Sequence, residues 1–389
     1  MSVPIYLSAE EAAAELCVRP ATLYAYVSRG LIRSVPGPGK KRRYDAADVR
    51  RLQGRRDPAE GSEPRPLSGD TVLETRLTMI TEDGPFYRGH SATALARSST
   101  LETVATLLWN CDDDPFAPDL PVSPRSAIQG LGPIERLMAA YSVWPLQDKA
   151  AFALSPNLLR RKGASMLRYG IAALLESQPS REPVHHQIGK AWGVEGPALY
   201  ILRAALVLSA DHELNTSAFA ARCAASTRAP LHAALLSGIG AFAGPRHGAN
   251  SDRVTAWLDE IGQDSDVEKV LGSRLARGEG LPGFGHRIYS GADPRADCLL
   301  QVLADFSTED PFSGLLTQIV ETGEALYGAK PNIDFALSAV QRTLGLPKDA
   351  AKVLFCSGRI VGWIAHALEQ YQNPDQIRPR ASYVGIPPA

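Results

Sequence analysis

One stretch of the sequence, Leu281 to Arg295 (LPGFGHRIYSGADPR), combines residue types that can bind and polarise a small anionic ligand. Gly283 and Gly285 precede a single histidine, His286, so the backbone can come close to a ligand while the imidazole is aimed at it. Arg295 supplies a planar guanidinium, which binds a carboxylate through two hydrogen bonds. A tight surface turn would use the same residues, so the interpretation depends on the rest of the chain.

Other positions also carry residues that suit acid–base chemistry or anion binding. His212 lies in an Asp-His-Glu triplet at the end of an apolar run, where the triplet could simply cap a helix. His247 follows an Ala/Gly-rich segment, in which small residues allow a helix or a ligand to approach closely. Asp334 precedes a helical pattern, where an aspartate could equally be an N-cap. The remaining candidates are arginines that, taken singly, could form surface ion pairs: Arg295, Arg359 and Arg378.

Taken together, the local sequences around these residues resemble the citrate synthase family. The matching motifs are Gly-Phe-Gly-His with Asp-Pro-Arg (283–295), Asp-His-Glu (211–213), Gly-Pro-Arg-His-Gly (244–248), Pro-Asn-Ile-Asp-Phe (331–335), Arg-Ile-Val-Gly-Trp-Ile-Ala-His (359–366) and the Arg-Pro-Arg tail (378–380). They occur in the family's order and extend over about residues 72–388. Independent coincidence does not explain so many matches in their proper contexts.

The resemblance implies the condensation of an acyl-CoA, acetyl-CoA or propionyl-CoA, with oxaloacetate. Asp334 is expected to remove a proton from the thioester's α-carbon, and His247 to donate a hydrogen bond to the thioester oxygen as the enol forms. His286 is expected to polarise the ketone and to protonate the new alkoxide, after which water cleaves the thioester. The expected ligands of the dicarboxylate, the last of them reaching across from a partner subunit, are His212, Arg295, Arg359 and Arg378. No metal or redox cofactor is expected.

The sequence departs from the family's pattern near the expected CoA site. Arg246 replaces the usual leucine before His247, and Ala249 replaces a glycine after it. The family commonly has a lysine after the position of Tyr289, whereas this chain has Ser-Gly. The expected CoA contacts are Arg287, which could replace that lysine, and the glycines of the motif, Gly283 and Gly285.

The elements that must position these residues are mainly helical. Ala/Leu-rich segments broken by Gly and Pro predict one continuous helix over 92–110 and further helices at 164–177, 196–210, 216–227, 230–243, 312–327 and 350–370. Alternation over Val72–Tyr87 predicts a short hairpin before them. The resemblance implies a two-domain helical fold over 72–389, in which a smaller subdomain at roughly 215–338 is inserted in the large domain and forms a cleft with it.

The first 56 residues differ from the rest of the chain in charge. They hold eleven Lys/Arg against five Asp/Glu, a net charge of +6, so the remaining residues must carry −7 of the total of −1. Residues 57–71 are rich in proline and lack any apolar period, which predicts an exposed linker. The chain is therefore expected to contain a basic module, a linker and a mildly acidic body.

The basic module, residues 1–56, resembles the winged helix-turn-helix of the MerR and excisionase type. Ser8 and Glu11 predict a capping box, Pro20 predicts the start of a second helix and Gly30 its end, and Asp45 predicts the cap of a third. Such modules place the second helix in the major groove of DNA and the basic wing on phosphates. The candidate DNA contacts are Thr22, Tyr24, Tyr26, Arg29, Lys40, Lys41, Arg42 and Arg43. A role in packing or partner contact is the alternative.

Composition excludes several other classes of protein. The N-terminus carries acidic residues where a signal peptide needs a basic region, and no apolar run approaches the ~20 residues that span a bilayer. The cysteines, at positions 17, 111, 223, 298 and 356, form no CxxC pair, which argues against zinc or a disulfide framework and favours a reducing cytoplasm. The histidine pair at 185–186 lies in a loop-like sequence without ligands at metal-binding spacing.

Two functions of different classes remain. The first is a synthase that acts as a homodimer or larger oligomer. The second is a DNA-binding transcriptional regulator that uses the synthase fold as a ligand sensor. The basic module favours the second hypothesis, whereas the complete Asp/His/His set favours the first, because a sensor has no use for a base beside the thioester.

Overall fold

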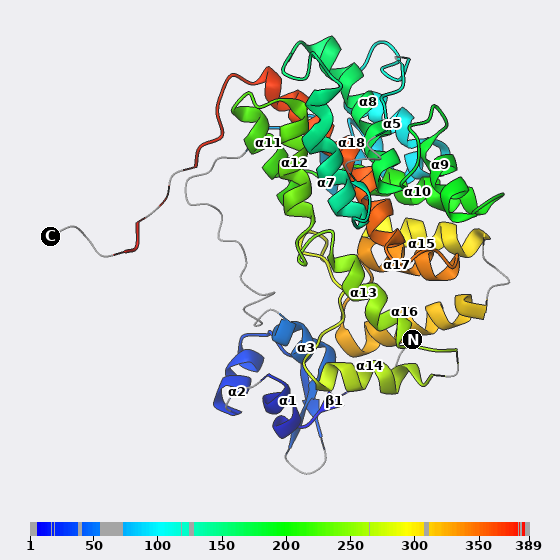
Figure 1. Ribbon diagram of the computed structural model, residues 1–389. Coiled ribbons are helices and arrows are strands. Elements are labelled where there is room, and N and C mark those ends of the chain that lie inside the picture. Colours follow the sequence, from blue (N-terminus) through cyan, green and yellow to red (C-terminus); the bar gives the residue numbers. More distant parts are fainter. Residues whose placement is uncertain are drawn as a thin grey trace.

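The computed structural model describes residues 6–16, 18, 20–37, 41–54, 73–117, 119–123, 128–263, 265–306, 311–379, 381 and 383–385. A small N-terminal module lies beside a larger, mainly helical body (Figure 1). The predicted fold class, mainly α with a winged helix-turn-helix in front, is confirmed. The expected linker at 57–71 lies outside the described residues.

The module contains a three-stranded antiparallel sheet of order β1-β3-β2, in which Val35 pairs with Arg43 and Leu7 with Tyr44. Its strand predicted at Lys40–Arg43 begins at Arg42, and Lys40 lies outside the described residues. Its elements are β1 (Tyr6–Leu7), α1 (Ala9–Glu15), α2 (Pro20–Ser28), β2 (Ser34–Pro36), β3 (Arg42–Asp45) and α3 (Ala46–Gly54).

Local chemistry sets the ends of the module's helices as predicted. The Ser8 amide donates to Glu11 Oε2 at 2.7 Å and the Glu11 amide donates to Ser8 Oγ at 3.2 Å, which confirms the capping box. Gly30 ends the turn after α2 with a left-handed φ of 71°. Asp45 Oδ1 accepts from the Asp48 amide at 3.1 Å and so caps α3.

The body begins with a second antiparallel sheet of order β4-β5-β6, formed by β4 (Thr78–Thr81), β5 (Gly84–Tyr87) and β6 (His90–Ser91). This confirms the predicted hairpin within the described residues. The single helix predicted over 92–110 is wrong, because two helices, α4 (Ala92–Ser98) and α5 (Leu101–Leu108), replace it. Ser99 is extended at the end of α4, and Thr100 Oγ1 accepts from the Thr103 amide at 3.2 Å and so starts α5.

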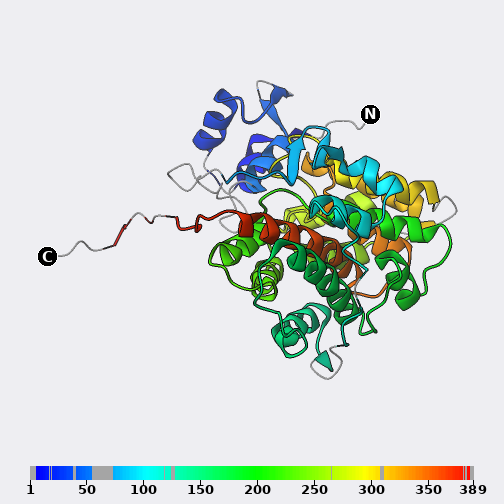
Figure 2. The same cartoon turned by 90° about the horizontal axis from the view of Figure 1, so that it is seen from above.

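The rest of the body is a stack of helices around α18, which runs through its middle (Figures 1 and 2). The predicted helices are confirmed, although the one expected from residue 164 already begins at Pro156. The elements are α7 (Pro133–Val143), η1 (Trp144–Leu146), α8 (Pro156–Leu174), α9 (Val184–Trp192), α10 (Ala198–Ser209), α11 (Thr216–Ser226), α12 (Leu231–Phe242), α13 (Asn250–Asp259), α14 (Val267–Ala276), α15 (Pro294–Phe306), α16 (Pro311–Tyr327), α17 (Ile333–Thr343) and α18 (Ala350–Gln372).

Helix α18 is by length and composition the one described helix that could cross a membrane, but 94% of its most apolar window is buried inside the protein. A central core helix has the same composition because it is covered on all sides. Its neighbours include α8, α10, α11, α12 and α17.

Two glycines let α18 approach α10 closely. A Cβ on Gly358 would meet the Leu206 carbonyl oxygen and lie 2.8 Å from Ser209 Cβ. A Cβ on Gly362 would meet the Ala210 carbonyl oxygen and lie 2.7 Å from Asp211 Oδ1. Glycine at these positions thus brings Arg359, which lies between them on α18, against the end of α10.

The buried apolar residues of the body form two clusters. The smaller cluster takes its members between Val254 and Phe335, from α13, α14, α16, the first turn of α17 and segments between these helices. Helices α11 and α12 contribute to the larger cluster instead. The second cluster therefore begins later than residue 215, the expected start of the smaller subdomain.

The N-terminal module contacts the body through α3, which packs on α16. In Figure 1, α2 lies on the side of the module away from α16. A Cβ on Gly328, at the end of α16, would lie only 2.7 Å from Ala47 Cβ. The module is therefore seated on the part of the body that contains the smaller cluster.

Gly362→Ala is expected to lower the unfolding free energy by about 1–3 kcal/mol, because the new methyl group has no room against Ala210 and Asp211. Gly272→Ala is the matched control. Gly272 lies in the middle of α14 with no atom near its virtual Cβ, so alanine should raise stability by ~0.5–1 kcal/mol. Urea unfolding measures both changes, and equal effects of the two substitutions would contradict the close α10–α18 contact.

Candidate functional site

His286 is oriented by its own loop. Its Nδ1 accepts from the amides of Ile288 at 3.1 Å and Tyr289 at 3.4 Å. Two amide donors face Nδ1 and one guanidinium donor, Arg295 Nη2, faces Nε2, so the two amides favour the neutral tautomer with its proton on Nε2. Burial, followed by the charge of Arg295, lowers the pKa of His286 to about 4. His286 is therefore a neutral N–H donor at pH 7.

Arg295 is held beside His286 by one buried carboxylate. Its Nε and Nη2 form a two-point pair with Asp293, at 3.0 and 2.8 Å, and Nη2 lies 3.3 Å from His286 Nε2. Burial opposes the charge of Arg295, but Asp293 outweighs it and raises the arginine's pKa. Asp293 Oδ2 also accepts from the Ile333 amide at 3.1 Å, so the same carboxylate fixes the start of α17.

His212, at the end of α10, faces the same place. Its Nε2 lies 2.9 Å from the Tyr289 hydroxyl, and its ring centroid lies 5.3 Å from that of His286. Burial, and then the charges of Arg295, His286 and Arg359, hold the pKa of His212 well below its usual value. Tyr289 thus connects His212 to the loop of His286.

Asp334 lies in the first turn of α17 and is not the helix cap. Asn332 is the cap, with Oδ1 accepting from the Asp334 and Phe335 amides. The Asp334 carboxylate accepts from Asn250 Nδ2 and from Ser251 Oγ, both at 2.9 Å, at the start of α13. Burial raises the pKa of Asp334 although both hydrogen bonds lower it. A carboxylate with a raised pKa is a stronger base.

His247 is fixed by Ser217, whose Oγ lies 2.7 Å from His247 Nε2. The same Oγ accepts from Trp363 Nε1 at 3.0 Å and lies 2.8 Å from Asn215 Oδ1. Asn215 Oδ1 also accepts two backbone amides as the cap of α11. The single hydroxyl proton of Ser217 can go to Asn215 Oδ1 or to His247 Nε2, and in the second arrangement the ring proton of His247 lies on Nδ1. Burial, followed by the charge of Arg359, lowers the pKa of His247 to about 3.

Arg359 extends from α18 into this cluster. Its Nε donates to the Ser209 carbonyl at 2.9 Å, its guanidinium lies over the Phe355 ring, and Nη2 is buried without a partner. Burial lowers its pKa to about 10, a value that still leaves it charged at pH 7. A buried guanidinium with a donor to spare is suited to a carboxylate ligand.

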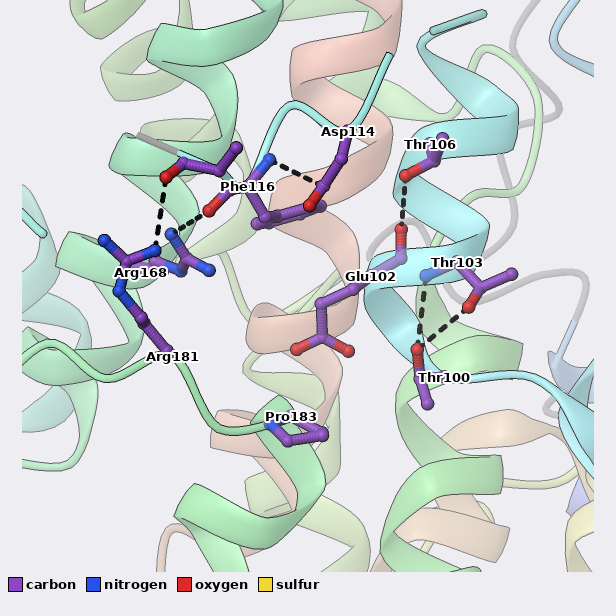
Figure 3. Close-up of a pocket in the computed structure, with 10 residues that line it drawn as sticks. Thr100, Glu102, Thr103, Thr106, Asp114, Phe116, Arg168, Arg181 and Pro183 are labelled. Atoms are coloured by element: carbon purple, nitrogen blue, oxygen red, sulfur yellow. Dashed lines mark hydrogen bonds between the residues drawn. The ribbon is translucent and has the colours of Figure 1, made fainter. Parts of the chain in front are cut away.

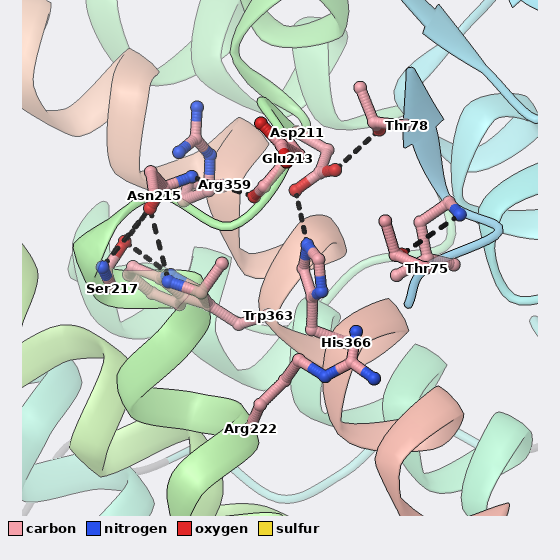
Figure 4. A network of polar contacts seen from close by, with 12 residues as sticks. Thr75, Thr78, Asp211, Glu213, Asn215, Ser217, Arg222, Arg359, Trp363 and His366 are labelled. Carbon is pink, nitrogen blue, oxygen red and sulfur yellow. Dashed lines mark hydrogen bonds and ion pairs between the residues drawn. The ribbon is translucent and has the colours of Figure 1, made fainter. Parts of the chain in front are cut away.

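A polar network that includes Arg359 adjoins the cluster (Figure 4). Asp211 is completely buried between Thr78 Oγ1, at 2.6 Å, and His366 Nε2, at 3.2 Å. Burial raises the pKa of Asp211, but His366, Arg359 and Thr78 together hold it below its usual value. The aspartate of the Asp-His-Glu triplet is thus a structural anion that precedes His212, and simple helix capping is not its role.

The structure therefore gathers six of the predicted residues in one place: His212, His247, His286, Arg295, Asp334 and Arg359. Arg378 is exposed on the C-terminal tail and is not part of this cluster within one chain. Arg287 is exposed. Gly283 and Gly285 have positive φ and contact residues 330–332 through the backbone, so the fold already requires them. Their contacts with CoA stay predictions.

Several residues that hold these side chains were not predicted. They are Asp293, Tyr289, Asn250, Ser251, Asn215 and Ser217. Asp293 lies in the same Asp-Pro-Arg motif as Arg295, so the motif contained a signal. The other partners of Asp334 and His247 come from distant segments, for which a single sequence gives no pairing signal.

The predicted DNA contacts have different environments. Tyr24 and Arg29 are exposed on and just after α2, and Lys41, Arg42 and Arg43 are exposed on the wing. Thr22 is half-buried. Tyr26 is half-buried and packs against the module's apolar core, more than half a helical turn from Tyr24, and its DNA contact stays a prediction.

A separate hollow of about 420 Å³ lies between α5, α8 and the loop before α9 (Figure 3) and contains none of the predicted site residues. Arg168 Nη1 there donates to the Phe116 carbonyl at 2.7 Å. Glu102 Oε1 accepts from the Val184 amide at 2.7 Å, at the start of α9. Helix α9 begins at Val184, so His185 is helical, whereas its sequence had suggested a loop.

Taken as chemistry, the cluster combines a base, two neutral N–H donors and two fixed cations. Asp334 can accept a proton, Nδ1 of His247 and Nε2 of His286 can each donate to an oxygen, and Arg295 and Arg359 can hold carboxylates. Such a set suits proton removal next to a carbonyl group, with an anionic second substrate.

Comparisons with known proteins agree with this chemistry. The family described as citrate synthase, C-terminal domain, matches residues 164–380, and a helix-turn-helix domain family matches residues 6–57. The chain is 29% identical to citrate synthase 2 of Bacillus subtilis, over 82% of this chain and 95% of that protein. It is 32% identical to 2-methylcitrate synthase of Shewanella oneidensis, over 83% of this chain and 95% of that protein. A solved structure, the ternary complex of Thermoplasma acidophilum citrate synthase with carboxymethyl coenzyme A and oxaloacetate, shares the fold at a TM-score of 0.67 and 23% identity, over 82% of this chain and 96% of that one.

The unfolding free energy is expected to fall as the pH is lowered from about 7 to about 5. The pKa values of His247 and His286 are about 3 and about 4 in the folded chain, so below the unfolded pKa the unfolded chain binds more protons. Each histidine should then remove up to about 1.4 kcal/mol of stability per pH unit below ~6.5. Urea unfolding across this range, with His247→Asn as the comparison, measures the effect. An equal pH dependence in the variant would contradict a buried neutral imidazole.

Proposed function

Because this chain belongs to the citrate synthase family, we propose that it condenses an acyl-CoA with oxaloacetate and hydrolyses the thioester, which gives citrate or 2-methylcitrate and free CoA. The acyl group is acetyl or propionyl, which differ by one methylene. The observation that carries the proposal is the half-buried Asp334 carboxylate, which is aligned by Asn250 and Ser251 among two imidazole donors and two arginines.

The first step is proton transfer from the thioester's α-carbon to Asp334. Burial of the carboxylate raises its pKa and so makes it a better base. His247 donates from Nδ1 to the thioester oxygen, on which negative charge develops as the enol forms. Because His247 is neutral at pH 7, it stabilises this oxygen by donating a hydrogen bond and not by carrying a positive charge.

The second step forms the carbon–carbon bond. The electron pair of the enol attacks the ketone carbon of oxaloacetate while His286 Nε2 donates to the ketone oxygen and protonates the alkoxide that results. The proton that Asp334 gained replaces the one that His286 gave up, so both side chains return to their starting state. Water then attacks the thioester carbonyl and CoA leaves as the thiol. This route uses no metal or redox cofactor, since each developing charge meets one of these side chains.

The arginines hold the dianionic substrate. Arg295, already aligned by Asp293, and Arg359, with its unpartnered Nη2, supply cations that keep their charge when buried. His212 completes the oxaloacetate site from the end of α10. The alternative, a regulator that keeps the fold only as a sensor, is not favoured, because it leaves the Asp334 and His247 arrangement without a task.

We infer further that the protein acts as a homodimer or a larger oligomer, with Arg378 completing the site of a partner subunit. Two observations support this. Leu146 and Phe152, in the segment between α7 and α8, have exposed fractions of 87% and 71%, high values for two large apolar side chains of one connection. The C-terminal tail also leaves the body of its own chain (Figure 1).

DNA binding by the N-terminal module is a second proposal. Its support is that α3 seats the module on the body while Tyr24, Arg29 and the wing residues stay exposed. Arg42 is partly engaged, because its Nε donates to Ser34 Oγ at 3.0 Å, whereas Arg43 is exposed on the same strand. A cytoplasmic location suits such a role and the four unpaired cysteines among the described residues.

Asp334→Asn is expected to reduce kcat by at least about a hundredfold, because an amide cannot accept the proton while it keeps the shape of the side chain. Release of free thiol with oxaloacetate and either acetyl-CoA or propionyl-CoA measures the rate. Oxaloacetate binding, followed by calorimetry, should be retained, since Asp334 does not hold its carboxylates. Wild-type activity in this variant would overturn the proposed role.

Arg43→Gln in the full chain is expected to weaken binding to a labelled random-sequence duplex and to reduce the slope of log K against log salt by about one. Arg277→Gln is the control, because Arg277 is an exposed arginine of the body, next to Glu279. Fluorescence anisotropy at several salt concentrations measures both. Failure of the wild-type chain to bind at low salt would contradict DNA binding and leave the condensation unaffected.

A further inference from the structure

Residues 328–334, here called the catalytic segment, connect the end of α16 to the first turn of α17. Gly328 ends α16 with a left-handed φ of 73°, and Asp334 lies six residues further on. Asn332 caps α17 through its Oδ1, so the placement of the Asp334 carboxylate follows from the path of this segment.

The catalytic segment is also bonded to the loop that carries His286. The Gly285 amide donates to the Lys330 carbonyl at 2.7 Å, and the Asn332 amide donates to the Gly283 carbonyl at 2.8 Å. Asn332 Nδ2 donates to the Gly285 carbonyl at 2.8 Å. A shift of the segment would therefore displace both the base, Asp334, and the ketone-polarising histidine, His286.

The N-terminal module contacts the segment at its first residue. Ala47, on α3, faces Gly328 so closely that a Cβ on the glycine would lie 2.7 Å from Ala47 Cβ and 3.2 Å from its Cα and carbonyl oxygen. Alanine and glycine are the two smallest residues, and their meeting lets the helix backbone rest directly on the segment. The neighbouring side chains Ala46 and Val49 are buried within the module, so Ala47 projects from the opposite face of α3.

We propose that the N-terminal module is a positioning element of the active site, which fixes the catalytic segment through the contact of Ala47 with Gly328. The inference rests on the proposed condensation and does not depend on DNA binding. It makes α3 part of the catalytic unit, although the module is a separate family match and contains none of the reacting groups. Arg359 lies on α18, outside the segment, and Arg295 on α15 is connected to the segment through Asp293, which accepts from the Ile333 amide, so substrate holding should be less affected than the chemistry.

Ala47→Leu in the full chain tests the proposal, because the larger side chain must separate α3 from Gly328. The expected result is a fall in kcat of about tenfold or more, with the KM for oxaloacetate changed by less than about threefold, since a displacement of one ångström slows catalysis strongly. The deuterium isotope effect with methyl-deuterated acetyl-CoA should increase, because a displaced Asp334 makes proton removal more rate-limiting. A mere loss of folded protein would leave the isotope effect unchanged.

Two variants serve as controls. Ser28→Leu introduces the same residue at an exposed position at the end of α2, away from the body, and should retain wild-type kinetics. Ala47→Ser keeps a small side chain at the contact and should also retain them. Wild-type kcat in Ala47→Leu, or equal losses in Ala47→Leu and Ser28→Leu, would overturn the proposal. Inactivity of the wild-type chain and of both controls would instead overturn the condensation.

A second pair of variants covers the case in which Ala47→Leu does not fold. Gly328→Ala places the new methyl group against Ala47 from the other side and should also lower kcat. Adding Ala47→Gly removes the opposing Cβ and should recover at least about threefold of the lost kcat, although the strained φ remains. No recovery in the double variant would show that the effect of residue 328 does not pass through the module.

Discussion

One buried carboxylate, Asp293, connects the parts of the site that must stay in register. It forms the two-point pair with Arg295, accepts from the Arg295 amide, and accepts from the amide of Ile333 at the start of α17. A carboxylate and a guanidinium buried together are tolerated only when their hydrogen bonds are satisfied. Because Asp293 meets that condition with backbone as well as side chain, the charge of Arg295, the ring of His286 and the helix of Asp334 are fixed relative to one another.

The electrostatics of the site follow from this arrangement. Two buried guanidiniums lie close to three histidines, and burial together with their charge lowers the pKa of each imidazole. The histidines are thus kept neutral while the arginines keep their charge. Neutral N–H donors can stabilise oxygens that gain negative charge, and the cations attract the dianion that the reaction consumes. Burial then raises the pKa of Asp334, which gives a stronger base in the same cluster.

The contacts that hold the site residues in place extend well beyond the site itself. Close packing of α18 on α10 through Gly358 and Gly362 brings Arg359 to the end of α10, where Asp211 is paired with His366. The catalytic segment, in turn, lies between the His286 loop and α3 of the N-terminal module. The module and the body, which look independent in composition and charge, therefore meet at Gly328, the first residue of the segment that ends at Asp334.

The sequence by itself determined the secondary structure at sites of strong local chemistry and the identity of the central residues. The capping box of Ser8 and Glu11 and the stop at Gly30 depend on neighbours within a few residues, and the structure has them as predicted. The motifs around His286 and Asp334 likewise named the residues that the fold brings together. The local signal failed at Ser99–Thr100, where a hydroxyl started a new helix inside an apparently continuous pattern.

Only the tertiary structure decided which groups align the reacting residues. Asn250 and Ser251 reach Asp334 from more than eighty positions away, and Ser217 reaches His247 from thirty. The contact of Ala47 with Gly328 joins residues that belong to two different family matches. Hydrogen bonds and close contacts between distant segments depend on how whole helices pack, and no periodicity or spacing in one sequence encodes them. The stretch around His286 named the chemistry and oriented the ring through its own backbone amides, while burial in the folded chain lowered the pKa of the imidazole.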